Sequence, residues 1–286
     1  MIGRAGMGRR SVAILGGRGM LGSDLAVACR DCGFDVRVFD LPEFDILNRT
    51  QVRQAVDAAD AIINCAALTN VDGAESQKEL ARRVNGEAVG LLGRLAADGS
   101  KWVLHFSTDF VFDGELDRPY MESDTPNPIS EYGRSKLAGE RFLEESDCSH
   151  CIVRLEWTYG VHGSNFVTKI IERARSSGRL KVVNDQVGSP TATTEVAGAA
   201  CRLLEQRVEG LFHFANSGYA SRFDVATFIA EQLSLNAEVS PCPSSEYHSP
   251  ARRPLNSRFD CTKIQALLGE PIRPWQAPLA CFLRHL

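Results

Sequence analysis

Residues 11–22 read SVAILGGRGMLG, and this stretch decides the fold class. Its first five residues form a short, largely apolar run that predicts a buried strand. The next seven contain Gly16, Gly19 and Gly22 at the spacing G-x-x-G-x-x-G, and a helical pattern covers residues 20–31. Glycines between a strand and a helix permit a tight turn and let the backbone approach a pyrophosphate, which the N–H groups of the helix N-terminus bind. The stretch therefore predicts dinucleotide binding; the alternative is an ordinary glycine turn.

Strand and helix patterns alternate after this stretch. Further strands are expected at residues 35–39, 61–65, 102–106 and 151–155, and helices at 50–58, 74–98 and 130–145. This alternation implies βαβ units, a parallel sheet and right-handed crossovers. After Trp157 the pattern is less regular, with strands expected at 180–183 and 210–214, helices at 165–176, 194–207, 223–233, 261–268 and 276–286, and a loop at 241–254.

The expected fold class is α/β. A Rossmann-like, doubly wound parallel sheet is expected over residues 11–157 and binds NAD(P). A smaller C-terminal α/β part, residues 158–286, is expected to bind substrate, with some segments returning to the first domain.

The composition limits the classes of function. A chain of 286 residues can bury a large core without disulfides, and 44% hydrophobic and 24% charged residues are ordinary globular values. No apolar run approaches the ~20 residues of a membrane span. A net charge of −4 argues against a nucleic-acid partner. Residues 1–10 lack the apolar segment of a signal peptide and are interpreted as a disordered basic arm, so the expected location is the cytoplasm.

Two cysteine pairs have spacing that recurs in zinc sites: Cys29 with Cys32, and Cys148 with Cys151. The gap between the pairs is much longer than in compact zinc modules. Cysteine also packs well as a small apolar residue. We therefore predict no metal site.

Acidic residues after the second strand bear on the choice of cofactor. Asp40 lies 18 residues beyond Gly22, where a carboxylate accepts hydrogen bonds from the adenosine ribose and repels a 2′-phosphate. This favours NADH; a plain turn residue is the alternative reading of Asp40. Arg18 would suit a 2′-phosphate, so NADPH remains open. Asp45 and Ile46 are expected near the adenine.

Tyr132 and Lys136 lie four positions apart on an expected helix, so their side chains share one face. An ammonium beside a phenol favours phenolate and is expected to lower the phenol pKa from about 10. Tyr132 then becomes a candidate proton donor or acceptor. Lys136 is also expected to hold the ribose hydroxyls of the cofactor. Such pairs are common on helix surfaces, but here the pair follows a dinucleotide loop and four strands.

Polar residues follow the third and fourth strands, at the edge where ligands of open parallel sheets gather. A Thr108 hydroxyl there can hydrogen-bond a substrate carbonyl or alkoxide, or can merely cap a turn. The segment Ala67, Leu68 and Thr69 is expected beside the nicotinamide. Asn85, in the long helical pattern, either orients the catalytic helix through a hydrogen bond or is merely tolerated there.

With these residues placed, the chain resembles the dTDP-4-dehydrorhamnose reductase family, within the extended short-chain dehydrogenase/reductase superfamily. Seven segments carry the resemblance: GGRGMLG (16–22), INCAALTNVDGAE (63–75), STDFVFDG (107–114), YGRSKLAGE (132–140), RLEWTYG (154–160), NDQVGSPT (184–191) and RRPLNSRFDCTKI (252–264). The glycine and Tyr/Lys motifs belong to the whole superfamily. The segments 184–191 and 252–264 are more specific to its sugar-nucleotide reductases.

The resemblance implies the last step of dTDP-L-rhamnose synthesis, in which NADH or NADPH reduces the C4 ketone of a dTDP-4-dehydro-6-deoxyhexose. It implies a catalytic set of Thr108, Tyr132 and Lys136, with Tyr132 as proton donor. The implied cofactor-lining residues are Gly19, Met20, Leu21, Ala67, Leu68, Thr69 and Phe106. Asp109 and Trp157 match substrate-contacting positions, Asn256 and Arg258 are candidates for the nucleotide end, and core packing is the alternative for Trp157. A monomer or homodimer is expected.

Three residues depart from the family pattern: Phe110 stands in place of tyrosine, Leu68 in place of histidine or tyrosine, and Glu156 in place of a small polar residue. They leave the particular sugar open. Some family members bind magnesium at a dimer contact, but no matching carboxylate set is found here.

Three other functions remain as alternatives. A dehydratase of the superfamily needs an acid/base residue where Phe110 stands, which argues against it. An epimerase uses the same Tyr/Lys chemistry. A non-catalytic relative, similar to the regulatory subunit of methionine adenosyltransferase, shares the fold and several motifs.

Overall fold

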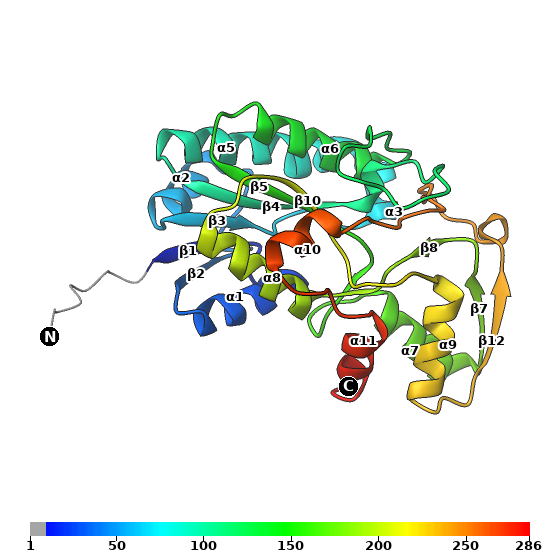
Figure 1. Ribbon diagram of the computed structural model, residues 1–286. Helices are drawn as coiled ribbons and strands as arrows, with labels where there is room; N and C mark the ends of the chain where they lie inside the picture. The colour runs from blue at the N-terminus through cyan, green and yellow to red at the C-terminus, as the bar shows by residue number, and fades with distance from the viewer. Residues whose placement is uncertain (1–9) are drawn as a thin grey trace, which may run out of the picture.

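A six-stranded parallel sheet forms the centre of the molecule (Figure 1). The computed structural model describes residues 10–286, so the arm expected at residues 1–10 lies, apart from Arg10, outside the described residues. The strands are β1 (Ser11–Leu15), β2 (Asp35–Phe39), β3 (Ala61–Asn64), β4 (Trp102–Thr108), β5 (His150–Leu155) and β10 (Gly210–Phe214). Their order is β10-β5-β4-β3-β1-β2, so β1 lies between β2 and β3. Open parallel sheets bind ligands at such a reversal, beyond the carboxyl ends of the strands.

Helices cover both faces of this sheet (Figure 1). One face carries α1 (Met20–Asp31), α8 (Thr193–Gln206) and α10 (Thr262–Leu268), and the other carries α2 (Arg49–Asp57), α5 (Ala88–Asp98) and α6 (Glu131–Glu144). Alternate residues of β1 enter the two apolar clusters: Val12 and Ile14 lie in one, Ala13 and Leu15 in the other. The expected doubly wound sheet is therefore confirmed. No helix within residues 10–286 has the length and apolar character needed to cross a membrane.

The C-terminal part has its own apolar cluster, which includes Ile170, Val225 and Leu279. It is built from α7 (Phe166–Ser177), β7 (Arg179–Val183), α9 (Arg222–Gln232), β12 (Glu238–Cys242) and α11 (Gln276–Leu283). β7 and β12 pair in parallel. In Figure 1, α7, α9, β7 and β12 lie together beside the carboxyl edge of the central sheet.

The single helix expected at residues 74–98 is wrong. The structure has α3 (Val71–Ser76), α4 (Lys78–Arg82), a π-helical turn η1 (Arg83–Glu87) and then α5. α3 begins early because the Asn70 side chain accepts a hydrogen bond from the N–H of Gly73, which makes Asn70 an N-cap. At Gln77 the backbone leaves helical geometry, with φ of −115°, and separates α3 from α4.

The loop expected at residues 241–254 is only partly correct, because β12 extends through Pro241 and Cys242 and a short 3₁₀ turn, η3 (Ser244–Glu246), follows. Pro241 fits there because β12 pairs with β7 alone, and an edge strand tolerates a missing N–H donor. Two-residue strands were also not expected, since they are too short to leave a periodic pattern. These are β6 (Thr158–Tyr159), β8 (Val187–Gly188), β9 (Thr191–Ala192) and β11 (Ala220–Ser221).

Candidate functional site

The glycine loop lies between the carboxyl end of β1 and the start of α1. Gly16 has a left-handed φ of 72°, and a Cβ there would lie 2.7 Å from the backbone nitrogen of Ala66. A Cβ on Gly22 would clash with the carbonyl oxygen of Gly16. No side chain caps α1 at Gly19. The loop is therefore a cradle of close backbone segments at an uncapped helix start, which fits the pyrophosphate of a dinucleotide.

Asp40 lies beside this loop, directly after β2. Its Oδ2 accepts a hydrogen bond of 2.7 Å from the backbone N–H of Arg18, and its Oδ1 accepts one of 2.8 Å from Leu41. The guanidinium of Arg18 forms an ion pair of 2.7 Å with Glu43. The predicted ribose acceptor is thus adjacent to the loop, and the cation that would suit a 2′-phosphate already has a carboxylate partner.

Asp45 and Ile46, the two residues predicted to lie near the adenine, differ in solvent accessibility. Asp45 is exposed, and its Oδ1 accepts a hydrogen bond from the N–H of Leu47. Ile46 is 6% exposed and packs in the apolar cluster around Val52 and Leu92. The side chain of Ile46 thus faces the core, and the contact of this residue with the adenine stays a prediction.

Asn85 joins the segment after β3 to the helix α6. Its amide accepts a hydrogen bond of 2.8 Å from the N–H of Leu68 and donates one of 3.1 Å to the carbonyl of Leu68. It also donates one of 2.9 Å to the hydroxyl of Ser135 on α6. Asn85 lies within the π-helical turn, a local distortion frequent at functional sites. Of the two alternatives for Asn85, the hydrogen bond to α6 is confirmed, and two further bonds of the same amide hold the backbone of Leu68.

Thr108, Asp109 and Tyr132 lie together at the carboxyl end of β4. Thr108 donates a hydrogen bond of 2.9 Å to Asp109, and its side chain faces the Tyr132 phenol. Thr108 also accepts a hydrogen bond from the N–H of Phe110, capping the turn η2 (Asp109–Val111). The ring of Phe110 packs edge-on against that of Tyr132, with centroids 5.5 Å apart. A hydroxyl and a phenol are therefore adjacent to each other at the expected ligand edge.

The expected lowering of the Tyr132 pKa is wrong in this structure. Burial raises the pKa of Tyr132 to about 12, and the nearby Asp109 carboxyl raises it further, while Thr108 opposes the change. Lys136 is directed elsewhere: its Nζ donates a hydrogen bond of 2.7 Å to the carbonyl of Phe106. A phenol with this pKa stays protonated near neutral pH, which suits a proton donor.

Lys136 is 3% exposed, and burial lowers the pKa of its ammonium to about 8, with Glu140 and Cys65 opposing the change. Its bond to Phe106 places the ammonium beneath the end of β4. Lys136 and Tyr132 thus share the inner face of α6, as their spacing predicted.

A buried ion pair between α6 and β5, not foreseen from the sequence, holds α6 against the sheet. Arg154 donates two hydrogen bonds to Glu140, of 2.9 Å and 2.6 Å, and both side chains are 3% exposed. One indication of this pair was present in the sequence. Arg154 is a charged residue within an apolar strand, and Glu140 lies one helical turn beyond Lys136.

Arg154→Met is expected to lower the free energy of unfolding by about 3–5 kcal/mol, because it leaves the Glu140 carboxylate buried without its partner. The double variant Arg154→Met/Glu140→Leu, which removes both charges, is expected to recover much of that loss. Urea unfolding of the three proteins measures both effects. A single-variant loss below about 1 kcal/mol would contradict this account.

Glu156 is a buried carboxyl at the carboxyl end of β5. It is 1% exposed; its Oε2 accepts a hydrogen bond of 2.9 Å from the N–H of Ser189, and its Oε1 has no partner among residues 10–286. Burial, and secondly the neighbouring Asp109, raise the pKa of Glu156 well above its usual value. Next to it, Trp157 has a left-handed φ of 44° and packs so closely on Gly188 that a Cβ there would lie 2.7 Å from the indole.

Glu156→Gln is expected to raise the free energy of unfolding at pH 8 but not at pH 4. Between the usual pKa of a glutamate and the raised pKa of Glu156, the folded protein binds a proton that the unfolded chain has lost. The wild type therefore loses about 1.4 kcal/mol for each pH unit of that interval, and a neutral amide does not. Urea unfolding at both pH values checks this, with the exposed Glu144→Gln as control. A gain of equal size at both pH values would refute the titration.

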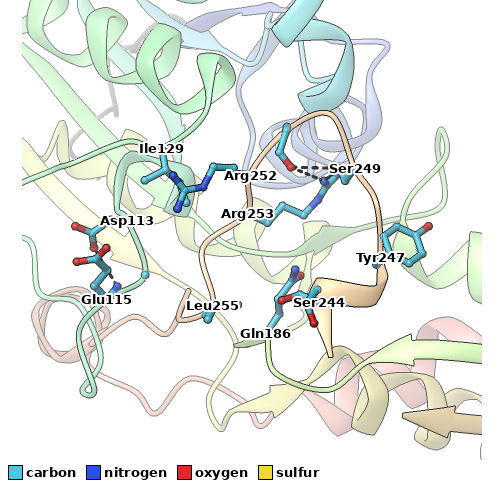
Figure 2. Close-up of a pocket in the computed structure, with 13 residues that line it drawn as sticks. Asp113, Glu115, Ile129, Gln186, Ser244, Tyr247, Ser249, Arg252, Arg253 and Leu255 are labelled. Atoms are coloured by element: carbon cyan, nitrogen blue, oxygen red, sulfur yellow. Dashed lines mark hydrogen bonds between the residues drawn. The ribbon is translucent and has the colours of Figure 1, made fainter. Parts of the chain in front are cut away.

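A cavity of about 810 Å³ is lined by residues that follow β4 and by residues from the C-terminal part. Figure 2 shows Arg252 extending toward Ile129 and Arg253 extending the other way, toward Ser249. Gln186 and Ser244 line another part of its wall. Arg253 forms an ion pair of 3.0 Å with Asp72, whereas Arg252 is exposed and has no ion pair within residues 10–286. The cavity thus presents guanidinium, amide and hydroxyl groups.

Asn256 and Arg258 do not line this cavity. The Asn256 amide donates to the carbonyls of Leu116 and Arg118, and its oxygen accepts from Arg258. Arg258 also donates to the carbonyl of Asp117. Both predicted nucleotide-binding residues are therefore engaged in internal hydrogen bonds, and the cavity residues of the same segment are Ala251, Arg252, Arg253 and Leu255.

The two cysteine pairs do not come together. Cys29 and Cys151 lie in the apolar cluster on one face of the sheet, and Cys148 lies in the cluster on the other. The sulfur of Cys29 is 3.7 Å from that of Cys201. Within residues 10–286, no group of three or more His, Cys, Asp or Glu side chains is arranged to hold a metal ion.

Comparison with known sequences gives one consistent family. Residues 10–286 match the family model described as the RmlD substrate binding domain. The dTDP-4-dehydrorhamnose reductase of Escherichia coli K12 is 34% identical over 294 residues, covering 96% of this chain and 98% of that protein. The enzyme of the same name from Mycolicibacterium smegmatis is 38% identical over 273 residues, covering 94% of this chain and 83% of that protein.

Solved structures agree with the sequence comparison. A dTDP-4-dehydrorhamnose reductase from Clostridium acetobutylicum is 33% identical with a TM-score of 0.92, covering 96% of this chain and 99% of that one. The enzyme from Bacillus anthracis in complex with NADP is 32% identical with a TM-score of 0.93, covering 98% of this chain and 100% of that one. A UDP-glucose 4-epimerase from Thermus thermophilus, 20% identical with a TM-score of 0.83, shares the fold.

Proposed function

The chain belongs to the dTDP-4-dehydrorhamnose reductase family, and we propose that it reduces the C4 ketone of a dTDP-4-dehydro-6-deoxyhexose with NADH or NADPH. The proposed reaction is the conversion of dTDP-4-dehydrorhamnose to dTDP-L-rhamnose. One observation carries the proposal: the Thr108 hydroxyl and the Tyr132 phenol lie together at the carboxyl end of β4, and Tyr132 shares a face of α6 with the buried Lys136. Names and ligands of relatives support the substrate and cofactor classes.

The proposed cofactor site is the glycine cradle and its surroundings. Gly16, Gly19 and Gly22 would let the backbone approach the pyrophosphate, with Met20 and Leu21 opening α1 beneath it. Asp40 would accept a hydrogen bond from a hydroxyl of the adenosine ribose. A relative whose structure contains NADP supports a nicotinamide cofactor.

The choice between NADH and NADPH depends on two side chains. Asp40 favours NADH, because its carboxylate repels a 2′-phosphate. Arg18 would have to leave its ion pair with Glu43 to bind that phosphate. We therefore propose NADH as the preferred donor and NADPH as the weaker one.

The bound nicotinamide supplies the hydride. Thr108 would hold the ketone oxygen, and Tyr132, protonated because of its high pKa, would donate the proton that the developing alkoxide requires. Lys136 would hold the cofactor ribose and stabilise the phenolate left after proton transfer. Asp109 and Trp157 would position the sugar, and Phe106, Ala67, Leu68 and Thr69 would line the nicotinamide side.

Consumption of NADH and NADPH against a panel of 4-dehydro-6-deoxy sugar nucleotides tests this proposal. The expected result is stoichiometric oxidation of the cofactor with at least one member, fastest with NADH and a dTDP-linked sugar. Interconversion of sugars without net oxidation of the cofactor would favour an epimerase instead. No activity, combined with stoichiometric recovery of an enzyme partner in a pull-down, would favour a regulatory subunit.

A further inference from the structure

Arg222, the first residue of α9, has a charged side chain that forms no ion pair or hydrogen bond within residues 10–286. Its guanidinium carbon lies 3.4 Å from the centre of the Trp157 ring and 4.7 Å from that of Phe166. The aromatic rings contact the guanidinium through their faces, which leaves its N–H groups directed along the edges. Within residues 10–286, no oxygen accepts a hydrogen bond from these N–H groups, and the side chain has no ion pair.

The two carboxyl groups that face Arg222 do not pair with it. Asp109 accepts hydrogen bonds from Thr108 and from Ser257, and Glu156 accepts one from Ser189. Burial raises the pKa of both carboxyls, which favours their neutral forms. Burial also lowers the pKa of Arg222, to about 9. The side chain is half-buried, and its unused N–H donors are free to bind an anion.

The position of Arg222 indicates which anion it would meet. On one side it faces Asp109, the neighbour of Thr108. On the other, its backbone N–H donates a hydrogen bond of 3.3 Å to the carbonyl of Gln186, which lines the cavity of Figure 2. Arg253, a second lining residue, is close enough to lower its pKa. The backbone of Arg222 thus bonds to a residue of the cavity wall, and its guanidinium is near enough to both Asp109 and Arg253 to feel their charges.

We infer that Arg222 binds the diphosphate of the sugar nucleotide, with the sugar at Thr108 and Tyr132 and the nucleoside in the cavity lined by Gln186 and Arg252. The inference rests on the proposed function, because it takes a sugar nucleotide as the substrate. A diphosphate supplies the negative charge that the guanidinium of Arg222 has no partner for. The planar fork of arginine donates paired hydrogen bonds to phosphate oxygens. A cavity of about 810 Å³ is within the usual size of a ligand pocket.

Calorimetric titration with thymidine diphosphate and with thymidine tests the inference without turnover. Arg222→Met is expected to weaken thymidine diphosphate binding roughly 10- to 100-fold, because hydrogen bonds to a charged group are lost, and to leave thymidine binding unchanged. Arg222→Lys, which keeps the charge without the fork, is expected to fall between the wild type and Arg222→Met. Binding of NADH is expected to stay unchanged. Arg175→Met serves as the control, because it removes from α7 an exposed arginine that has no ion pair within residues 10–286.

Three outcomes would overturn the inference. One is equal affinity of wild type and Arg222→Met for thymidine diphosphate. Another is an equal loss of affinity for thymidine and its diphosphate, since that would mean that Arg222 only supports Trp157. The third is a wild type that binds neither thymidine diphosphate nor uridine diphosphate. Failure of the proposed function is separate: it appears as absence of cofactor oxidation, while the diphosphate-selective loss in Arg222→Met would still show a nucleoside diphosphate site.

Discussion

Tyr132→Phe is expected to lower kcat roughly 10²–10⁴-fold while leaving the dissociation constant of the cofactor unchanged. The phenol lies beside Thr108 at the end of β4, and its pKa of about 12 keeps the proton available for transfer. Phenylalanine preserves the ring and its edge contact with Phe110, so the change removes the proton and little else. Steady-state cofactor oxidation gives kcat, and fluorescence titration gives cofactor affinity.

Tyr159→Phe is the matched control. Tyr159 is 1% exposed, and its hydroxyl has no hydrogen-bond partner within residues 10–286, so loss of that hydroxyl is expected to change neither stability nor turnover. If Tyr132→Phe retained turnover within about tenfold of the wild type, Tyr132 would not be the proton donor. If both variants lost turnover equally, the effect would be one of folding.

Gly22→Ala is expected to abolish most cofactor binding and with it most turnover. A methyl group at this position would clash with the Gly16 carbonyl oxygen and would lie 2.6 Å from the Cα of Gly17, so the loop must move away from α1. A displacement of about 1 Å in a positioning element can cost roughly 10²-fold, and we expect at least that loss in cofactor affinity. Titration with NADH and with NADPH measures it directly.

Gly198→Ala provides the control for the added methyl group. Gly198 lies in α8, and a Cβ there would meet no atom within 4 Å. Alanine is favoured over glycine inside a helix by about 1 kcal/mol, so this variant is expected to be slightly more stable and fully active. Cofactor affinity in Gly22→Ala equal to that of the wild type would contradict the assignment of the loop.

The sequence predicts the architecture of the sheet because its signals are local and repeated. Each long strand is an apolar run bounded by turns, and the glycine loop marks the first crossover. The two-residue strands β6, β8, β9 and β11 could not be predicted, since they exist only through pairing between distant segments. The π-helical turn around Asn85 likewise depends on contacts with Leu68 and Ser135 from other elements.

The placement of the candidate catalytic residues is more predictable than their pKa values. The spacing of Tyr132 and Lys136 places both on one face of α6, as observed. The direction of the Tyr132 pKa shift was wrong because the sequence reveals neither the burial of the phenol nor the bond of Lys136 to the Phe106 carbonyl. Both properties arise from packing against β4.

Substrate recognition was the least predictable part of the site. Asn256 and Arg258 belong to a segment that borders the cavity, but their side chains bond to the neighbouring backbone. Arg222 had no distinguishing pattern in the sequence. Its contact with Trp157 arises only because the fold brings the end of β5 and the start of α9 together.

Transfer of deuterium from reduced cofactor labelled at the nicotinamide C4, tested at each of its two positions in turn, probes the proposed reaction most directly. With dTDP-4-dehydrorhamnose as substrate, we expect one label position to deliver a single deuterium to C4 of the sugar, with one cofactor oxidised for each product formed. Mass spectrometry and proton resonance of the product locate the label. A product that forms without deuterium from either position, or a sugar left unchanged while the enzyme is folded and cofactor-bound, would contradict reduction at that carbon.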